Sequence, residues 1–164
     1  MSTTGNQTAF QFGLHDYDLL CAVLGIASIG INWGDFSLLI GTECIDAIDK
    51  DGKLREIGEF IVKFFPRQKK FTFENITRTP MRQSPELDQP TVSTGYFHHP
   101  HINEDGVMCI SNGNSEIMLA MADGVFSKAM KMIMPALRMD MRFVRRDTAY
   151  MELVLWPLKS EVQK

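Results

Sequence analysis

Apolar residues recur at intervals of three and four between Asp16 and Ile31. This spacing places them on one side of a helix, so the pattern predicts a buried helix that begins near Asp16 and runs to Ile31. An aspartate in the first turn suits the positive end of the helix dipole. Gly25 and Gly30 weaken this prediction, because glycine costs about 1 kcal/mol relative to alanine inside a helix.

Strand-like segments follow this first region. Phe36–Ile48 is rich in Leu, Ile and Thr, and Asp49–Gly52 has the composition of a tight turn. Ile57–Phe65 is almost entirely apolar, and residues 66–70 read as a second turn. We therefore expect the segments on either side of Asp49–Gly52 to pair as an antiparallel hairpin.

The strand pattern continues towards the middle of the chain. Residues 71–77 alternate apolar and polar side chains, which is typical of a half-buried strand. Three prolines mark residues 78–90 as an extended loop, and Thr91–Phe97 is a further short strand. The sequence thus predicts an antiparallel meander of three or four strands over about residues 55–97.

The hydrophobic period changes again at Ser115. Spacing by three and four predicts one helix over residues 115–136, packed on one face of the meander, with Pro135 kinking or ending it. The region 138–164 is ambiguous, because Met139, Met141 and Phe143 alternate like a strand whereas Asp147-Thr148 resembles a helix cap. Helix, antiparallel strands, loop and helix in this order predict an α+β fold.

Composition narrows the class of protein. The 164 residues are 45% apolar and 23% charged, so we expect a short disordered N-terminus, residues 1–10, and a single domain over residues 11–164. The formal net charge of −3 argues against nucleic-acid and membrane partners. Three cysteines without a secretory signal favour a reducing, cytoplasmic location. The longest apolar run, residues 19–31, is too short to span a bilayer.

Reactive side chains concentrate in one stretch. Three of the four histidines and one of the three cysteines lie between His98 and Asn112. His99 and His101 form an H-x-H pair, but no second Cys/His pair stands at a zinc-binding spacing, so we expect no metal and no cofactor. A thiol reaction at Cys109 is the better hypothesis, because this residue follows a turn and precedes a polar loop.

The other thiols have a different setting. Cys21 and Cys44 lie in apolar runs, so we expect both to be buried and without a chemical role. Cys109 is flanked by Met108 and Ile110, so a buried structural thiol remains an alternative there.

The stretch His99–Ile110, HPHINEDGVMCI, resembles the active-site motif of ubiquitin-conjugating enzymes, in the His-Pro-His form of bacterial or phage members. In that family a His-Pro-Asn sequence precedes the catalytic cysteine, which lies eight residues after the asparagine. Cys109 lies eight residues after His101, and Gly106 lies three before it, as in the family. The resemblance implies a ubiquitin-conjugating-like fold, with the clearest match over about residues 55–137.

The resemblance also implies a reaction. Cys109 is expected to carry a ubiquitin-like modifier as a thioester and to pass it to an amine, with an activating enzyme and a target protein as partners. His101 and Asn112 are expected to donate hydrogen bonds to the oxyanion. His99, Pro100 and Gly106 are expected to support the turn.

Two departures keep other functions open. His101 stands where the family has asparagine, and a Trp-Pro pair occurs only at Trp156-Pro157, far beyond the cysteine. One alternative is therefore a catalytically inert domain of this fold that acts as a scaffold or protein-binding module. The other is an unrelated structural or assembly protein.

Overall fold

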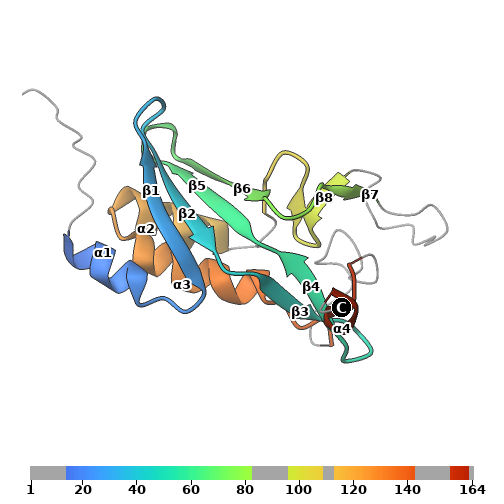
Figure 1. The fold of residues 1–164 in the computed structure, drawn as a ribbon. Coiled ribbons are helices and arrows are strands. Elements are labelled where there is room, and N and C mark those ends of the chain that lie inside the picture. Colours follow the sequence, from blue (N-terminus) through green and yellow to red (C-terminus); the bar gives the residue numbers. More distant parts are fainter. Residues whose placement is uncertain (1–13, 83–95, 109–112, 143–155, 163–164) are drawn as a thin grey trace, which may run out of the picture.

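The computed structural model describes residues 14–82, 96–108, 113–142 and 156–162 (Figure 1). The elements in chain order are α1 (Leu14–Cys21), β1 (Ile26–Asn32), β2 (Ser37–Thr42), β3 (Ile45–Ile48), β4 (Leu54–Gly58), β5 (Phe60–Phe65), the 3-10 helix η1 (Pro66–Gln68), β6 (Lys70–Asn75), β7 (Met81–Arg82), β8 (Tyr96–His99), β9 (Ile102–Asn103), α2 (Gly113–Ala122), α3 (Phe126–Leu137) and α4 (Lys159–Val162).

Four antiparallel strands form the main sheet in the order β1–β2–β5–β6 (Figure 1). β3 and β4 pair antiparallel as a second, two-stranded sheet, and Gly58 at the end of β4 has φ 123°. The predicted turn joins them, with the Asp49 carboxylate accepting hydrogen bonds from the N–H groups of Asp51 and Lys53. The α+β class and the antiparallel pairing are confirmed, but the meander predicted for residues 55–97 is divided among three sheets. β5 and β6 lie in the main sheet, β4 pairs with β3, and β8 pairs with β7 and β9.

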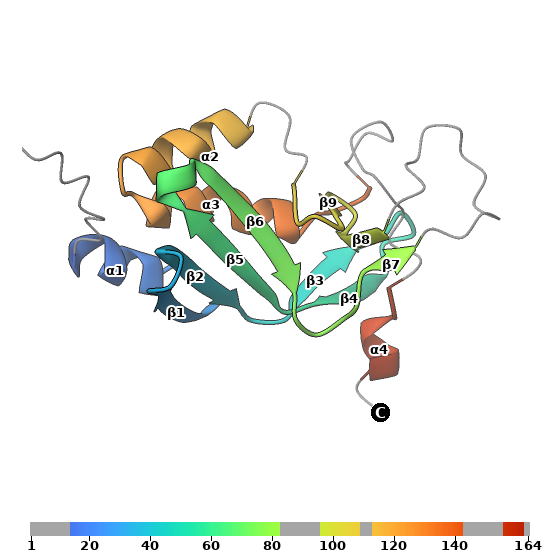
Figure 2. The ribbon, with the colours of Figure 1, turned by 90° about the horizontal axis from the view of Figure 1, so that it is seen from above.

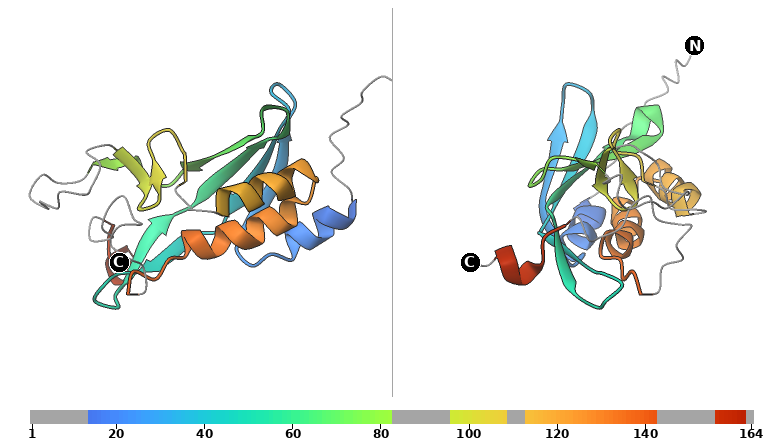
Figure 3. Two further views of the ribbon diagram at one scale, coloured as in Figure 1. Left: turned by 180° about the vertical axis from the view of Figure 1, so that it is seen from behind. Right: turned by 90° about the vertical axis from the view of Figure 1, so that its right-hand side faces the viewer.

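Helices cover one face of this sheet. α2 and α3 lie side by side, and α1 lies beside α3 (Figures 2 and 3). At the centre of the contact, the Phe64 ring of β5 meets the Phe126 ring of α3 edge-on, with centroids 5.3 Å apart. The buried residues of this interface are mainly aliphatic: Leu38, Ile40, Val62, Ile117, Met130 and Ile133.

The single helix predicted for residues 16–31 is wrong in its second half. The helix ends at Cys21, and Ile26–Asn32 forms the edge strand β1 instead. Gly25 separates the two with φ 91°, a conformation that ends a helix. The isoleucines of β1 favour an extended chain, and pairing with β2 outweighs the helical spacing.

The single helix predicted for residues 115–136 is also wrong, because it is divided into α2 and α3. Gly124, with φ 71°, separates them. The Asp16 carboxylate then accepts hydrogen bonds from the N–H groups of Phe126 and Ser127 and from the Ser127 hydroxyl. This buried side chain of α1 therefore caps the N-terminus of α3. α3 passes through Pro135 and ends at Leu137.

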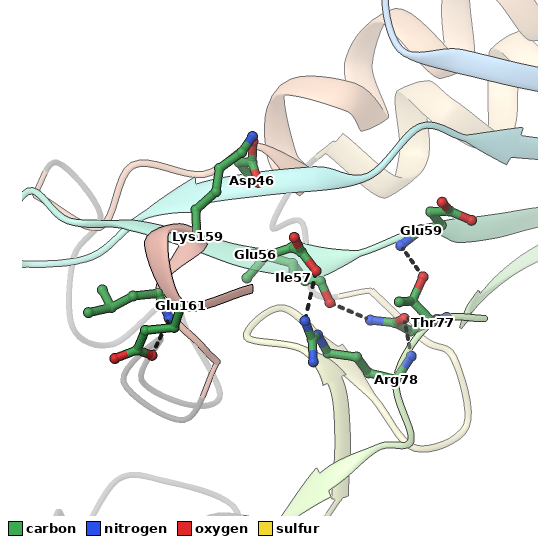
Figure 4. A network of polar contacts seen from close by, with 10 residues as sticks. Asp46, Glu56, Ile57, Glu59, Thr77, Arg78, Lys159 and Glu161 are labelled. Carbon is green, nitrogen blue, oxygen red and sulfur yellow. Dashed lines mark hydrogen bonds and ion pairs between the residues drawn. The ribbon is translucent and has the colours of Figure 1, made fainter. Parts of the chain in front are cut away.

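The described C-terminal residues lie against β4. Trp156 is 1% exposed, and its carbonyl accepts a hydrogen bond of 2.8 Å from the Arg55 guanidinium. Lys159 of α4 forms an ion pair with Asp46 of β3 (Figure 4). The proposed cap at Asp147-Thr148 lies outside the described residues. No helix in the described ranges is long and apolar enough to cross a bilayer.

Candidate functional site

The histidine-rich motif forms a short hairpin, residues 96–108, which we call the site hairpin. β8 pairs with β9 antiparallel, with Phe97 opposite Asn103 and His99 opposite Ile102. Pro100 and His101 make the turn between these strands, and Pro100 is buried. The His-Pro-His sequence thus occupies the bend of a hairpin that also pairs with β7.

His99 anchors this hairpin in the core. The side chain is 0% exposed, and its ring lies edge-on to Phe60 with centroids 6.0 Å apart. Nδ1 accepts the main-chain N–H of His101 at 3.1 Å, so Nε2 carries the proton and donates to the Leu137 carbonyl at 3.0 Å. The inward position expected for His99 is confirmed, and both ring nitrogens are paired.

The surroundings of His99 keep it neutral. Its pKa is lowered to about 3, first by burial and then by the neighbouring His101, and the bond to the Leu137 carbonyl opposes both effects. A second proton would sit on Nδ1, which already faces an N–H donor. His99 is therefore a positioning group and not a proton carrier at neutral pH.

Gly106 fixes the second turn of the site hairpin. It has φ 73°, and its carbonyl accepts the N–H of Phe73 on β6 at 2.9 Å. A Cβ at this position would lie 2.4 Å from the Phe73 carbonyl oxygen, so only glycine allows this close approach. Within the same turn, the N–H of Val107 donates to the Asn103 side chain at 2.9 Å. The site hairpin is thereby held to the main sheet by its backbone.

The hairpin holds the residue that precedes the candidate nucleophile. Met108 is buried and bridges to Ile102, and its carbonyl accepts a hydrogen bond of 3.3 Å from the Asn114 amide in α2. Cys109 and Asn112, the predicted nucleophile and one of the predicted oxyanion donors, lie outside the described residues. The structure thus brings together His99, Pro100, His101 and Gly106, and fixes the chain up to Met108.

His101 and His98 differ from His99 in exposure. The His101 ring is half-buried and lies 5.9 Å from the His99 ring, centroid to centroid. His98 lies on β8, where its Nδ1 faces the N–H of Asn75 at 3.4 Å, and burial lowers its pKa. Of these three side chains, only His99 is fully enclosed.

Cys21 and Cys44 are exposed, so the expectation that both are buried is wrong. Cys21 ends α1, and Cys44 lies between β2 and β3, where the chain leaves the sheet face. Partial burial raises the pKa of the Cys44 thiol, and so do the nearby carboxylates, first that of Glu56 (Figure 4 shows this region). An exposed thiol with a raised pKa reacts slowly.

Several supporting residues carry no local sequence signal. Asp16 caps a helix 110 residues away, and the Leu137 carbonyl reaches His99 across 38 residues. Asn75, at the end of β6, donates to the carbonyls of Ile57 and His98. The one hint in the sequence is a polar residue at the end of a strand, as Asn75 is in β6.

Metal binding has no support in the described part of the chain, where no three His, Cys, Asp or Glu side chains are arranged to share an ion. No protein-family model, curated protein or solved structure matches this sequence or its fold. The functional argument therefore depends on the residues themselves.

Proposed function

We propose that this protein is a ubiquitin-conjugating-like carrier, which holds a protein modifier as a thioester on Cys109 and transfers it to an amine. The observation that carries the proposal is the buried His99, bonded on one side to the His101 N–H and on the other to the Leu137 carbonyl. This is the supporting role that the resemblance assigns to the first histidine of the motif.

The order of the elements gives independent support. An antiparallel meander precedes the His-Pro-His turn, and helices follow the cysteine and cover one face of the sheet. Gly106, three residues before Cys109, is required by its contact with Phe73 and not merely tolerated. Both features support the resemblance beyond the identities of the motif residues.

The first chemical step is thioester exchange. The Cys109 thiolate attacks the carbonyl carbon of a donor thioester and forms a new C–S bond. The donor C–S bond breaks, and the donor sulfur leaves as a thiolate that takes a proton from solvent. The two thioesters are similar in energy, so the site needs to position the carbonyl more than to activate the thiol.

The second step is aminolysis. An amine nitrogen attacks the same carbonyl, the Cys109 C–S bond breaks, and the amide product forms while the amine loses one proton to solvent. Negative charge develops on the carbonyl oxygen in both steps, so a hydrogen-bond donor there lowers the barrier. His101 and Asn112 are the side chains that we assign to this role.

A small thioester tests the proposal without the unidentified partners. The protein is mixed with a peptide thioester that ends in glycine, which presents an unhindered carbonyl, and its intact mass is measured. We expect one peptide to be added and to be released by excess thiol. In a background with Cys21→Ser and Cys44→Ser, this adduct remains; Cys109→Ala abolishes it, and Cys109→Ser abolishes it or gives an oxyester that resists thiol.

Variants of the donors separate an active carrier from an inert domain. His101→Ala is expected to slow the exchange by roughly 10²-fold, as for loss of one oxyanion donor. His15→Ala, on the exposed surface of α1, is the matched control and leaves the rate unchanged. If Cys109→Ala leaves the adduct in place, or no adduct forms, the inert scaffold replaces the carrier as the account of this chain.

A further inference from the structure

Two turns meet at one end of the main sheet, and we call them together the sheet tip: residues 33–36 between β1 and β2, and residues 66–70, which follow β5 and include the first residue of β6. They lie side by side and project beyond the helices (Figures 1 and 3). The Arg67 guanidinium stacks over the Phe36 ring, 4.0 Å from its centroid. Segments about 30 residues apart in sequence thus form one surface.

Large apolar side chains of the sheet tip face solvent. Trp33 is 71% exposed and Phe36 is 40% exposed. The other tryptophan of the chain, Trp156, is 1% exposed. An exposed tryptophan contributes much less to the stability of the fold than a buried one does. The exposed position of Trp33 therefore points to a role outside the core.

Backbone strain is concentrated at the same place. Phe36 and Lys69 have φ of 54° and 50°, and they are the two non-glycine residues with positive φ in the described ranges. Side chains other than glycine adopt this conformation at a cost, and such residues cluster at functional sites. One of the two strained residues presents an aromatic ring, and the other presents a cation.

The charge of the sheet tip differs from that of the whole protein. Arg67, Lys69 and Lys70 are exposed, and none of them forms an ion pair with a described residue. The single acidic residue, Asp35, accepts hydrogen bonds from the N–H and hydroxyl of Ser37. These nine residues carry a formal charge of +2, which leaves −5 on the rest of the chain.

We propose that the sheet tip binds an anionic lipid bilayer, with Trp33 entering the headgroup region and Arg67, Lys69 and Lys70 contacting lipid phosphates. A tryptophan beside cations is the combination that favours the membrane interface. The acidic remainder of the chain is repelled by the same surface, so the protein docks by this end. The inference does not depend on the proposed function of Cys109.

The shape of the surface favours a bilayer over a soluble polyanion. An acidic peptide gains most from a groove or a free strand edge, and single-stranded nucleic acid from a row of open aromatic faces. Here two turns project outwards, and one face of the second aromatic ring, Phe36, is already covered by Arg67. A protruding tip with the exposed indole of Trp33 is suited to insertion into the headgroup region of a bilayer.

Tryptophan fluorescence tests this directly in the intact protein. Vesicles of phosphatidylcholine with phosphatidylserine are titrated at low salt, with pure phosphatidylcholine as the comparison. We expect the Trp33 emission to shift to shorter wavelength with the anionic vesicles only, and to be quenched by brominated lipid. Trp156 is enclosed and serves as the unshifted internal reference.

Vesicle co-sedimentation then measures the charged contacts. Lys69→Gln and Lys70→Gln are each expected to weaken binding roughly fivefold, and Trp33→Ser, which removes the indole from the headgroup region, is expected to weaken binding as well. Lys53→Gln is the matched control, because Lys53 is exposed on the turn between β3 and β4 at the other end of the sheet. It is expected to leave binding unchanged.

Three results would overturn the inference. The first is absence of any emission shift or sedimentation with anionic vesicles at low salt. The second is equal binding to neutral vesicles. The third is binding of soluble poly-glutamate or of an oligothymidylate that depends on Lys69 and Lys70 while the vesicles give no shift, which would assign the tip to a soluble polyanion.

Discussion

The site hairpin and the sheet tip are both turns attached to the same sheet, but they are built in opposite ways. In the site hairpin, polar groups point inward and find partners, as His99 does with the Leu137 carbonyl. In the sheet tip, Trp33 and Lys69 are exposed to solvent, and the backbone of Lys69 has a positive φ. One turn is fixed by its contacts with the core, whereas the other presents side chains outward.

This difference predicts which property each region controls. A substitution in the site hairpin removes buried contacts, so it lowers the free energy of unfolding first and activity as a consequence. A substitution in the sheet tip removes few internal contacts, so it alters binding and leaves stability nearly unchanged. Each of the following measurements compares a residue with a matched control position and so tests this difference.

The largest effect is expected for His99→Ala. The change leaves a cavity in the core and removes the partners of the His101 N–H and the Leu137 carbonyl. We expect the free energy of unfolding to fall by about 4 kcal/mol, measured by urea denaturation. His15→Ala is the control, with a change within about 0.5 kcal/mol. Equal losses for the two variants would mean that His99 does not anchor the hairpin.

Gly106→Ala is expected to be nearly as damaging. The added methyl group would lie 2.4 Å from the Phe73 carbonyl oxygen, in a backbone with φ 73°. We expect a loss of about 3 kcal/mol in thermal or chemical unfolding. Gly30→Ala on β1 meets nothing within 4 Å, so its effect should stay within about 0.5 kcal/mol. A tolerated Gly106→Ala would show that the contact with β6 is loose.

Acid should weaken the fold through His99. The unfolded chain binds a proton at this residue near pH 6.5, whereas burial holds its pKa at about 3 in the folded state. The unfolded state therefore binds more protons between these values, and the free energy of unfolding falls as pH is lowered, by up to about 1.4 kcal/mol per pH unit.

Denaturation curves between pH 7 and pH 5 measure this slope. His99→Gln should lose most of it, and the remaining slope includes His98, whose lowered pKa acts in the same direction. An unchanged slope in His99→Gln would place the protonation elsewhere.

The smallest effect concerns strain in the sheet tip. Lys69 has φ 50°, so Lys69→Gly removes strain and is expected to raise the free energy of unfolding by about 0.5 kcal/mol while weakening vesicle binding. Lys70→Gly, one residue later in β6, should lower stability by about 0.5–1 kcal/mol, because glycine weakens a strand. If both variants changed stability in the same direction, the strain argument would fail.

Local patterns in the sequence predicted much of the fold. The turn at Asp49–Gly52 and the apolar strand β5 depend on neighbouring residues, and the structure has both. The inward position of His99 was implied by the resemblance and not by a local pattern. β1 could not be predicted in this way, because its isoleucines also fit a helical spacing. Only pairing with β2 decides between the two.

Other features that the sequence pattern did not predict depend on contacts between distant residues. The cap of α3 is supplied by Asp16, far away in α1, and the sheet tip combines two turns that are separate in the sequence. The net charge of −3 predicted no membrane partner, and an average of this kind does not report that Arg67, Lys69 and Lys70 share one turn, in which Arg67 stacks on Phe36. The exposure of Cys21 and Cys44 likewise depends on where the chain leaves the core.

The most direct test of the central claim is to locate the thioester among the three thiols of the unmodified protein. The chain is exposed to a limiting amount of the glycine-ending peptide thioester, digested at low pH, and mapped by mass spectrometry. The account predicts the peptide on Cys109, with little on the exposed Cys21 and Cys44, and its loss to an added amine. Peptide shared among the three in proportion to exposure, or absent from Cys109, would contradict it.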